Sequence, residues 1–109
     1  MEDKKKLLWE ILVPKFSNNR KRFRISFHKN WDREVEKVSG GLTILRTAKG
    51  RWINPDKRLF VDEMIPVRIS CSEKDIEKIM NFTLKYYNQE SVFCYLVSDK
   101  VKILKRKKK

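Results

Sequence analysis

Two cations flank a glycine ahead of a tryptophan in the segment Lys49-Gly50-Arg51-Trp52. Lysine and arginine attract phosphate groups, and a glycine lets a ligand approach the backbone because it has no side chain. An indole ring offers a flat surface on which a base can stack. We therefore predict that these four residues bind a polyanion, which is either a nucleic acid or a phosphorylated nucleotide.

Three further charged residues belong to this predicted ligand-binding site: Arg46, Glu63 and Arg68. Glu63 is the one acid in an otherwise apolar row of alternate residues from Leu59 to Cys71. A carboxylate buried in such a row needs a partner, or it takes up a proton. We expect Arg46 to lie diagonally across a hairpin and to pair with Glu63. Two roles remain open for Glu63, a structural ion pair and a ligand contact.

An enzymatic function would depend on His28 and Glu63 as an acid–base pair. The sequence has one histidine and contains no glycine-rich phosphate loop, nucleophile motif or paired catalytic acids. A single histidine after an extended segment is more often structural, and Trp31 and Trp52 are more often core residues than stacking surfaces. We predict no catalytic residues and favour a binding function.

The predicted site lies in one long β-hairpin over residues 40–63. Leu42–Arg46 alternates in polarity, and Asn54–Lys57 has proline at the second position of a type I turn. A turn centred on Pro55 and Asp56 sets the register of the two strands. Four cross-strand pairs are then expected to face the core: Trp52–Leu59, Gly50–Val61, Ala48–Glu63 and Ile44–Val67.

Apolar spacing predicts the other elements. They are a strand over Leu7–Val13, an extended piece over Phe23–Phe27, a helix that Asn30 caps and Gly40 ends, a helix that Ser72 caps and Asn88 or Gln89 ends, and strands over Val92–Val97 and Val101–Leu104. The order is that of a ferredoxin-like α+β fold (βαββαβ), with an antiparallel sheet, two helices on one face and a short extra C-terminal strand.

The sheet face away from the helices is expected to be apolar. It carries Leu12, Leu45, Phe60 and Met64 in the predicted register. An apolar patch of this kind marks a partner surface, and a common solution is to pack it against a second copy. We predict a homodimer through this open sheet face, and the alternative is cover by residues 15–24 or by the last strand.

The formal net charge is +13 at pH 7, with 27 Lys and Arg against 14 Asp and Glu. Three basic clusters stand out: residues 105–109, Arg20-Lys21-Arg22 with Arg24, and Lys49, Arg51, Lys57 and Arg58. Positive potential attracts polyanions without sequence preference. We expect one domain over residues 1–104, followed by a disordered basic tail over residues 105–109.

The remaining composition bears on location and cofactors. No apolar run is long enough to span a membrane, and the short apolar segment near the acidic start does not fit a secretory signal. Cys71 and Cys94 lie in apolar segments and lack the close spacing of a metal or disulfide pair, so we expect small buried side chains. We predict a cytoplasmic protein without membrane contact, metal or other cofactor.

Several short motifs together resemble a family of small uncharacterised bacterial and phage domains. They are Trp31, Gly41-Leu42-Thr43-Ile44, Gly50-Arg51-Trp52, Glu63, Tyr87 and Gln89-Glu90-Ser91-Val92. The resemblance covers residues 31–97 and implies a ferredoxin-like fold with no assigned activity. This sequence departs from the family in the basic residues around Gly50 and in its tail. We predict a small basic accessory protein of a phage or mobile element, and the alternative is an interaction or inhibitor module that acts on a host or defence protein.

Overall fold

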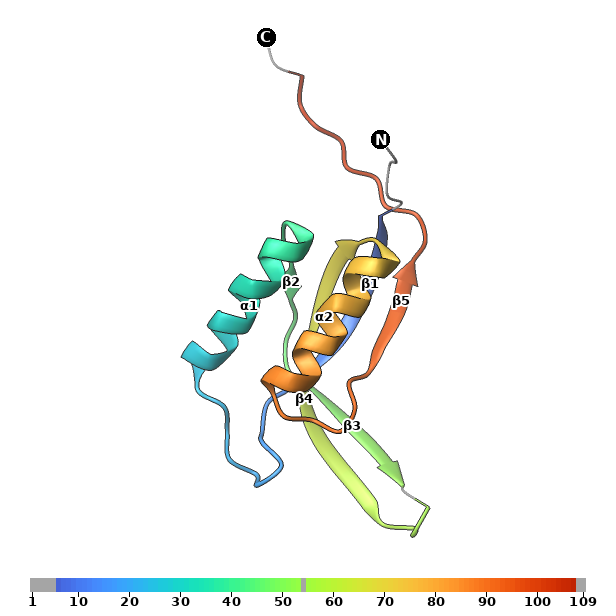
Figure 1. The fold of residues 1–109 in the computed structure, drawn as a ribbon. Helices are drawn as coiled ribbons and strands as arrows, with labels where there is room; N and C mark the ends of the chain where they lie inside the picture. Colours follow the sequence, from blue (N-terminus) through green and yellow to red (C-terminus); the bar gives the residue numbers. More distant parts are fainter. Residues whose placement is uncertain (1–5, 54, 108–109) are drawn as a thin grey trace.

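The computed structural model describes residues 6–53 and 55–107, which form an antiparallel sheet with two helices on one face (Figure 1). The elements are β1 (Leu7–Pro14), α1 (Ile25–Ser39), β2 (Thr43–Ile44), β3 (Ala48–Ile53), β4 (Leu59–Cys71), α2 (Glu73–Tyr86) and β5 (Cys94–Ser98). The strand order is β2-β4-β1-β5, and β3 also pairs with β4. The predicted ferredoxin-like α+β fold is confirmed.

The core lies between the helices and one face of β1 and β4. Alternate strand residues point into it because successive side chains of a strand face opposite ways. Its most buried members are Ile11, Val13, Trp31, Val35, Val67, Ile69, Cys71, Ile76, Ile79 and Tyr87, each at most 2% exposed. Trp31 Nε1 donates to Thr83 Oγ1 at 3.0 Å, which ties α1 to α2. Trp31 is therefore a core residue.

Helix α1 begins earlier than its sequence predicts. Asn30 is not its cap, because the helix starts at Ile25 after Arg24, whose side chain makes no capping hydrogen bond. The Phe27 ring stacks on the Tyr86 ring of α2 with centroids 4.2 Å apart. We attribute the extra turn to this contact, since packing of an apolar face stabilises a helix more than local propensity does. The helix ends as predicted, at Gly40 with φ of 88°.

The second helix and the C-terminal part agree with prediction in some places. Ser72 Oγ accepts a hydrogen bond from the Asp75 amide at 3.2 Å, so the predicted N-cap of α2 is confirmed. The last regular residue of α2 is Tyr86, and β5 begins at Cys94 rather than Val92. The predicted strand over Val101–Leu104 is absent, and Leu104 is 99% exposed. Of the predicted tail, residues 105–107 are exposed without regular structure, and residues 108–109 lie outside the described residues.

Strand β4 is longer than its neighbour β1 and carries a two-stranded extension. It pairs with β1 through residues 64–71 and with β3 through residues 59–64. Residues 48–53 and 59–63 therefore project beyond the rest of the sheet (Figure 1), and we call this hairpin the arm. Pro55 and Asp56 lie in its turn, where Lys57 has φ of 61°, whereas Asn54 lies outside the described residues.

The register of the arm differs from the prediction by one residue. Ile44 lies opposite Val67 as expected, but Lys49 lies opposite Glu63 and Arg51 opposite Val61. Ala48 lies four residues after Ile44, whereas its partner Met64 lies only three residues before Val67. One extra residue therefore separates β2 from β3. The predicted pairs Trp52–Leu59, Gly50–Val61 and Ala48–Glu63 are wrong. A one-residue shift reverses the faces, so Lys49, Arg51 and Ile53 share the side of Glu63, Val61 and Leu59.

Candidate functional site

The predicted ligand-binding residues fall in two places. Lys49, Gly50, Arg51 and Trp52 lie on β3, and Glu63 lies opposite Lys49 at the base of the arm. Arg46 lies exposed in the connection between β2 and β3. Arg68 lies apart from the arm, opposite Glu10 and Thr43 on the open sheet face. The structure thus brings six of the seven residues near one hairpin and separates the seventh.

The Arg46–Glu63 pair is not formed. Within residues 6–53 and 55–107, no ion pair joins the two side chains, and the register places Lys49 directly across from Glu63. Glu63 is half-buried at the base of the arm, and its carbonyl oxygen accepts a hydrogen bond from the Lys15 amide at 3.3 Å. The cation nearest to Glu63 in register is therefore Lys49.

The acid that the structure buries is Glu10, which is 6% exposed. Arg68 Nε donates to Glu10 Oε1 at 3.0 Å, and the Tyr95 hydroxyl donates to Glu10 Oε2. Both carboxylate oxygens thus have partners, as a buried charge requires. The sequence signal was an acid between Leu8 and Leu12 with an arginine at the matching position of β4. This match between Glu10 and Arg68 can be recognised only when the β1–β4 pairing is known.

A second basic segment lies at the same end of the molecule as the arm (Figure 1). Its cations are Lys15, Arg20, Lys21, Arg22 and Arg24, and residues 15–24 contain no acid. The Phe23 amide donates to the Lys15 carbonyl at 3.1 Å, and the Lys15 amide donates to Glu63. Asn18 Nδ2 donates to the Asn88 carbonyl at 2.9 Å. These bonds hold the basic loop, residues 15–24, next to the base of the arm.

The arm is also apolar on the side that carries its cations. Ile53, Leu59 and Val61 are 68%, 53% and 52% exposed. They share this side with Lys49 and Arg51. A two-stranded ribbon without a covering layer is marginally stable by itself in water. Within the described residues, these aliphatic side chains therefore leave one side of the arm without an apolar covering layer.

His28 takes part in a helix–helix contact. Its Nδ1 lies 2.6 Å from the Tyr87 hydroxyl oxygen, and burial, together with the charge of Arg22, lowers the pKa of His28 from its ordinary 6.5. Burial raises the pKa of Tyr87, so the hydroxyl stays protonated. In the described part of the chain, no hydrogen bond or ion pair joins His28 to Glu63. The two residues of the proposed acid–base pair are not brought together.

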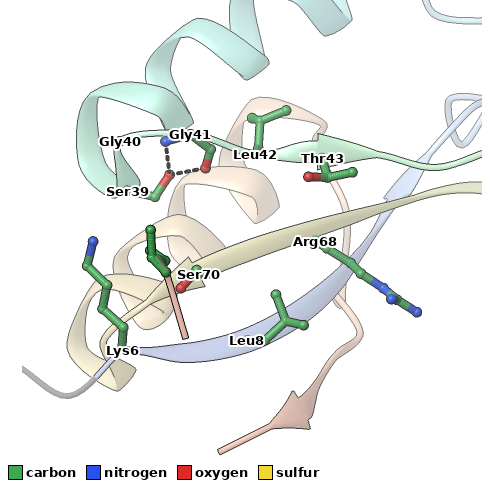
Figure 2. A pocket seen from close by; sticks show the side chains of 10 residues that line it. Lys6, Leu8, Ser39, Gly40, Gly41, Leu42, Thr43, Arg68 and Ser70 are labelled. Carbon is green, nitrogen blue, oxygen red and sulfur yellow. Dashed lines mark hydrogen bonds between the residues drawn. The ribbon is translucent and has the colours of Figure 1, made fainter. Parts of the chain in front are cut away.

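A depression of about 290 Å³ lies at the other end of the sheet (Figure 2). We call it the Gly40 depression, and its lining residues are Lys6, Leu8, Ser39, Gly40, Gly41, Leu42, Thr43, Arg68, Ser70 and Ile103. The residues come from four separate segments, so the site could not be recognised from the sequence. The pair Gly40-Gly41 was its only local signal.

The two cysteines are free. Cys71 is 2% exposed and Cys94 is half-buried beside the core. Burial raises the pKa of each thiol to about 11, which leaves both protonated at neutral pH. Among the described residues, no group of three His, Cys, Asp or Glu side chains could hold a metal ion, and neither helix has the length and apolar character of a membrane span.

The element order and strand topology define a ferredoxin-type α+β protein. No protein-family model matches the sequence, and no curated protein matches it. A phage SAM lyase solved in complex with S-methyl-5'-thioadenosine is 13% identical with a TM-score of 0.65, over 91% of this chain and 85% of that one. CutA1 from Oryza sativa is 10% identical with a TM-score of 0.66, over 90% and 83% of the two chains.

A third structure extends the comparison to a bacterium. The divalent cation tolerance protein CutA1 from Thermus thermophilus is 8% identical, with a TM-score of 0.62 over 94% of this chain and 87% of that one. At such identities the similarity is one of fold. The fold is therefore one that phage, bacterial and plant proteins share.

Proposed function

We propose that the chain is a small basic binding module that holds a nucleic acid between the arm and the basic loop. One observation carries the proposal, namely that both segments lie at the same end of the molecule and are hydrogen-bonded to each other. Residues 15–24 and 46–63 together contain ten Lys and Arg against three acids. Such a concentration of positive charge attracts the phosphates of a nucleic acid whatever its base sequence.

The shape of the arm supports the same ligand. A two-stranded β-ribbon fits the major groove of duplex DNA, which is about 12 Å wide. Lys49 and Arg51 are two residues apart on β3, so their side chains leave the same side of the ribbon about 7 Å from each other. Two neighbouring phosphate contacts from one strand follow from this spacing. Gly50 lies between them, and because it has no side chain, the backbone on the opposite side of the ribbon is uncovered at this position.

A phosphorylated nucleotide is the smaller ligand of the same chemistry. The phage SAM lyase of the same fold was solved with a nucleoside bound. For this chain, Lys49 and Arg51 would hold the phosphate, and Arg46 and Glu63 would border the ligand. We further propose that the protein serves a phage or mobile element and acts in the cytoplasm.

The test compares two double variants that each remove two positive charges. Lys49→Ala with Arg51→Ala should weaken binding of a 20-bp duplex at least about tenfold and lower the slope of log affinity against log salt by about two. Lys74→Ala with Lys78→Ala removes exposed cations of α2 and is the matched control. Fluorescence anisotropy at three salt concentrations measures both. Equal losses in the two variants would show that only net charge matters and would overturn the proposal.

The exposed aliphatic side of the arm favours a second candidate function. Ile53, Leu59 and Val61 suit an interaction or inhibitor module that docks on a host or defence protein. Val61→Ser removes apolar area but no charge. If this variant abolishes the biological effect of the protein while duplex affinity stays unchanged, the protein-interaction function replaces the nucleic-acid function.

A further inference from the structure

The Gly40 depression combines two kinds of wall. Leu8, Leu42 and Ile103 supply apolar surface, whereas Lys6, Ser39 and Ser70 supply polar groups. Figure 2 shows Lys6 and Arg68 on opposite sides of Leu8 and Ser70. Small-molecule sites are commonly lined this way, by apolar side chains with a few polar groups that fix orientation. At about 290 Å³, the depression has room for a metabolite but not for a polymer.

Ser70 is the residue that the fold does not explain. Its hydroxyl is buried and has no hydrogen-bond partner in the described part of the chain. A buried hydroxyl without a partner destabilises a folded protein, and such groups are uncommon. Ser70 lies opposite Leu8 in the β1–β4 pairing and lines the depression, so a rotation about its Cα–Cβ bond would turn the buried hydroxyl toward a bound molecule.

The charges around the depression select the ligand. Lys6 is exposed, and Arg68 keeps its two terminal guanidinium nitrogens for other partners because only Nε is bonded to Glu10. Both cations favour an anionic group. The C-terminal end of α1 carries partial negative charge and favours hydrogen-bond donors instead. There the Ser39 hydroxyl lies 2.8 Å from the Gly41 carbonyl oxygen and 3.0 Å from that of Val35.

We infer that the Gly40 depression binds a small organic anion that also carries hydroxyl groups, of the size of a sugar phosphate. The anionic group meets Lys6, Arg68 adds positive potential from the other side of Leu8, and the ligand hydroxyls meet Ser70 and the end of α1. This site lies away from the arm and does not rest on the nucleic-acid function. Its failure would leave that function untouched, because the arm variants do not alter any lining residue.

The experiment uses ribose 5-phosphate as the probe, with ribose and inorganic phosphate for comparison. Titration followed by amide NMR should shift the signals of Gly40, Gly41 and Ser70 with ribose 5-phosphate at concentrations up to about 10 mM, a range that covers millimolar dissociation constants. Lys6→Gln should weaken binding about tenfold, the effect of one hydrogen bond to a charged group, and Ser70→Ala about fivefold, the effect of one between neutral groups. Ser26→Ala and Lys29→Gln change exposed residues of α1 and should leave binding unchanged.

A stability measurement separates a ligand contact from a structural role. Ser70→Ala removes the unpartnered hydroxyl, so the free protein should melt at the same temperature or higher while ribose 5-phosphate binds more weakly. A lower melting temperature with unchanged binding would show that the hydroxyl has a water or protein partner, and the inference would be wrong. Equal shifts with inorganic phosphate, unaffected by Ser70→Ala, would show only attraction of anions to surface lysines and would also overturn it.

Discussion

Arg68 Nε lies 3.0 Å from Glu10 Oε1, and the two residues are opposite each other in the β1–β4 register. Glu10 is almost fully buried, whereas the Arg68 side chain is 44% exposed. The pair therefore has one desolvated member and one solvated member. Most of its effect on stability must come from keeping the Glu10 carboxylate satisfied, because the exposed guanidinium gains little from the bond.

We predict that Arg68→Ala lowers the free energy of unfolding by about 2 kcal/mol, since removal of one partner leaves a buried charge. Glu10→Gln with Arg68→Gln should recover part of this loss, because no charge is then left unpaired. Urea unfolding of the single and double variants gives the comparison. A double variant that is less stable than Arg68→Ala would contradict the account.

The end of α1 offers a comparison between adjacent glycines. A side chain at either Gly40 or Gly41 would meet nothing within 4 Å, but only Gly40 has a positive φ. Gly40→Ala should therefore destabilise the protein by about 1 kcal/mol through backbone strain alone. Gly41→Ala should be neutral or slightly stabilising, because it restricts the unfolded chain. Thermal unfolding without ligand measures both, and equal effects would rule out strain as the cause.

The pH dependence of stability should contain a contribution from His28. Burial and Arg22 lower its pKa in the folded protein, so the unfolded chain takes up the proton first as the pH falls below 6.5. Stability from this group is complete above pH 6.5 and is lost as the pH falls through the folded pKa. Chemical unfolding at a series of pH values should show the loss, and His28→Gln should remove it.

Asp32 lies near His28 and also titrates in acid, so its contribution to stability must be separated from that of His28. Burial and Glu36 raise the pKa of Asp32 from its ordinary 3.8, so its contribution is complete below that pH and is lost as the pH rises. The sign is opposite to that of His28, so the two contributions change stability in opposite directions as the pH falls. If His28→Gln keeps the full loss of stability below pH 6.5, another group causes it.

The predicted homodimer can now be tested with a residue of known exposure. Phe93 is 63% exposed, its ring lies 5.8 Å from that of Tyr95, and its carbonyl accepts a hydrogen bond from Leu12. Phe93→Asp should turn a dimer into a monomer at micromolar concentration in light scattering. Ile25→Asp, on the far side of the molecule at 69% exposure, is the control. A wild-type monomer would remove the dimer proposal.

Local chemistry made some parts of the fold predictable. The ends of the helices at Gly40 and Ser72 follow from a left-handed backbone and a capping hydroxyl, which depend on a few neighbouring residues. The start of α1 depends on Phe27 meeting Tyr86, 59 residues later in the chain. No short stretch of sequence contains that information.

The candidate sites also differ in whether neighbouring residues or distant contacts determine them. The cations of the arm were evident because Lys49 and Arg51 are neighbours in sequence. The predicted partner of Glu63 is wrong because residues 45–47, which include the extra residue, contain no glycine or proline that would indicate an irregular strand. The Gly40 depression requires Lys6, Ser70 and Ile103 to meet, and their proximity follows only from the complete topology.

That extra residue also determines where the arm points. Removing one residue from 45–47 would give an uninterrupted ladder from Ile44 to Ile53 in which every β3–β4 pair stays the same. What would change is the local bend and twist that an unpaired residue introduces. The direction in which the arm leaves the body is therefore set by the length of a three-residue connection. Insertions and deletions there would turn the arm toward differently shaped partners while Lys49 and Arg51 keep their places on β3.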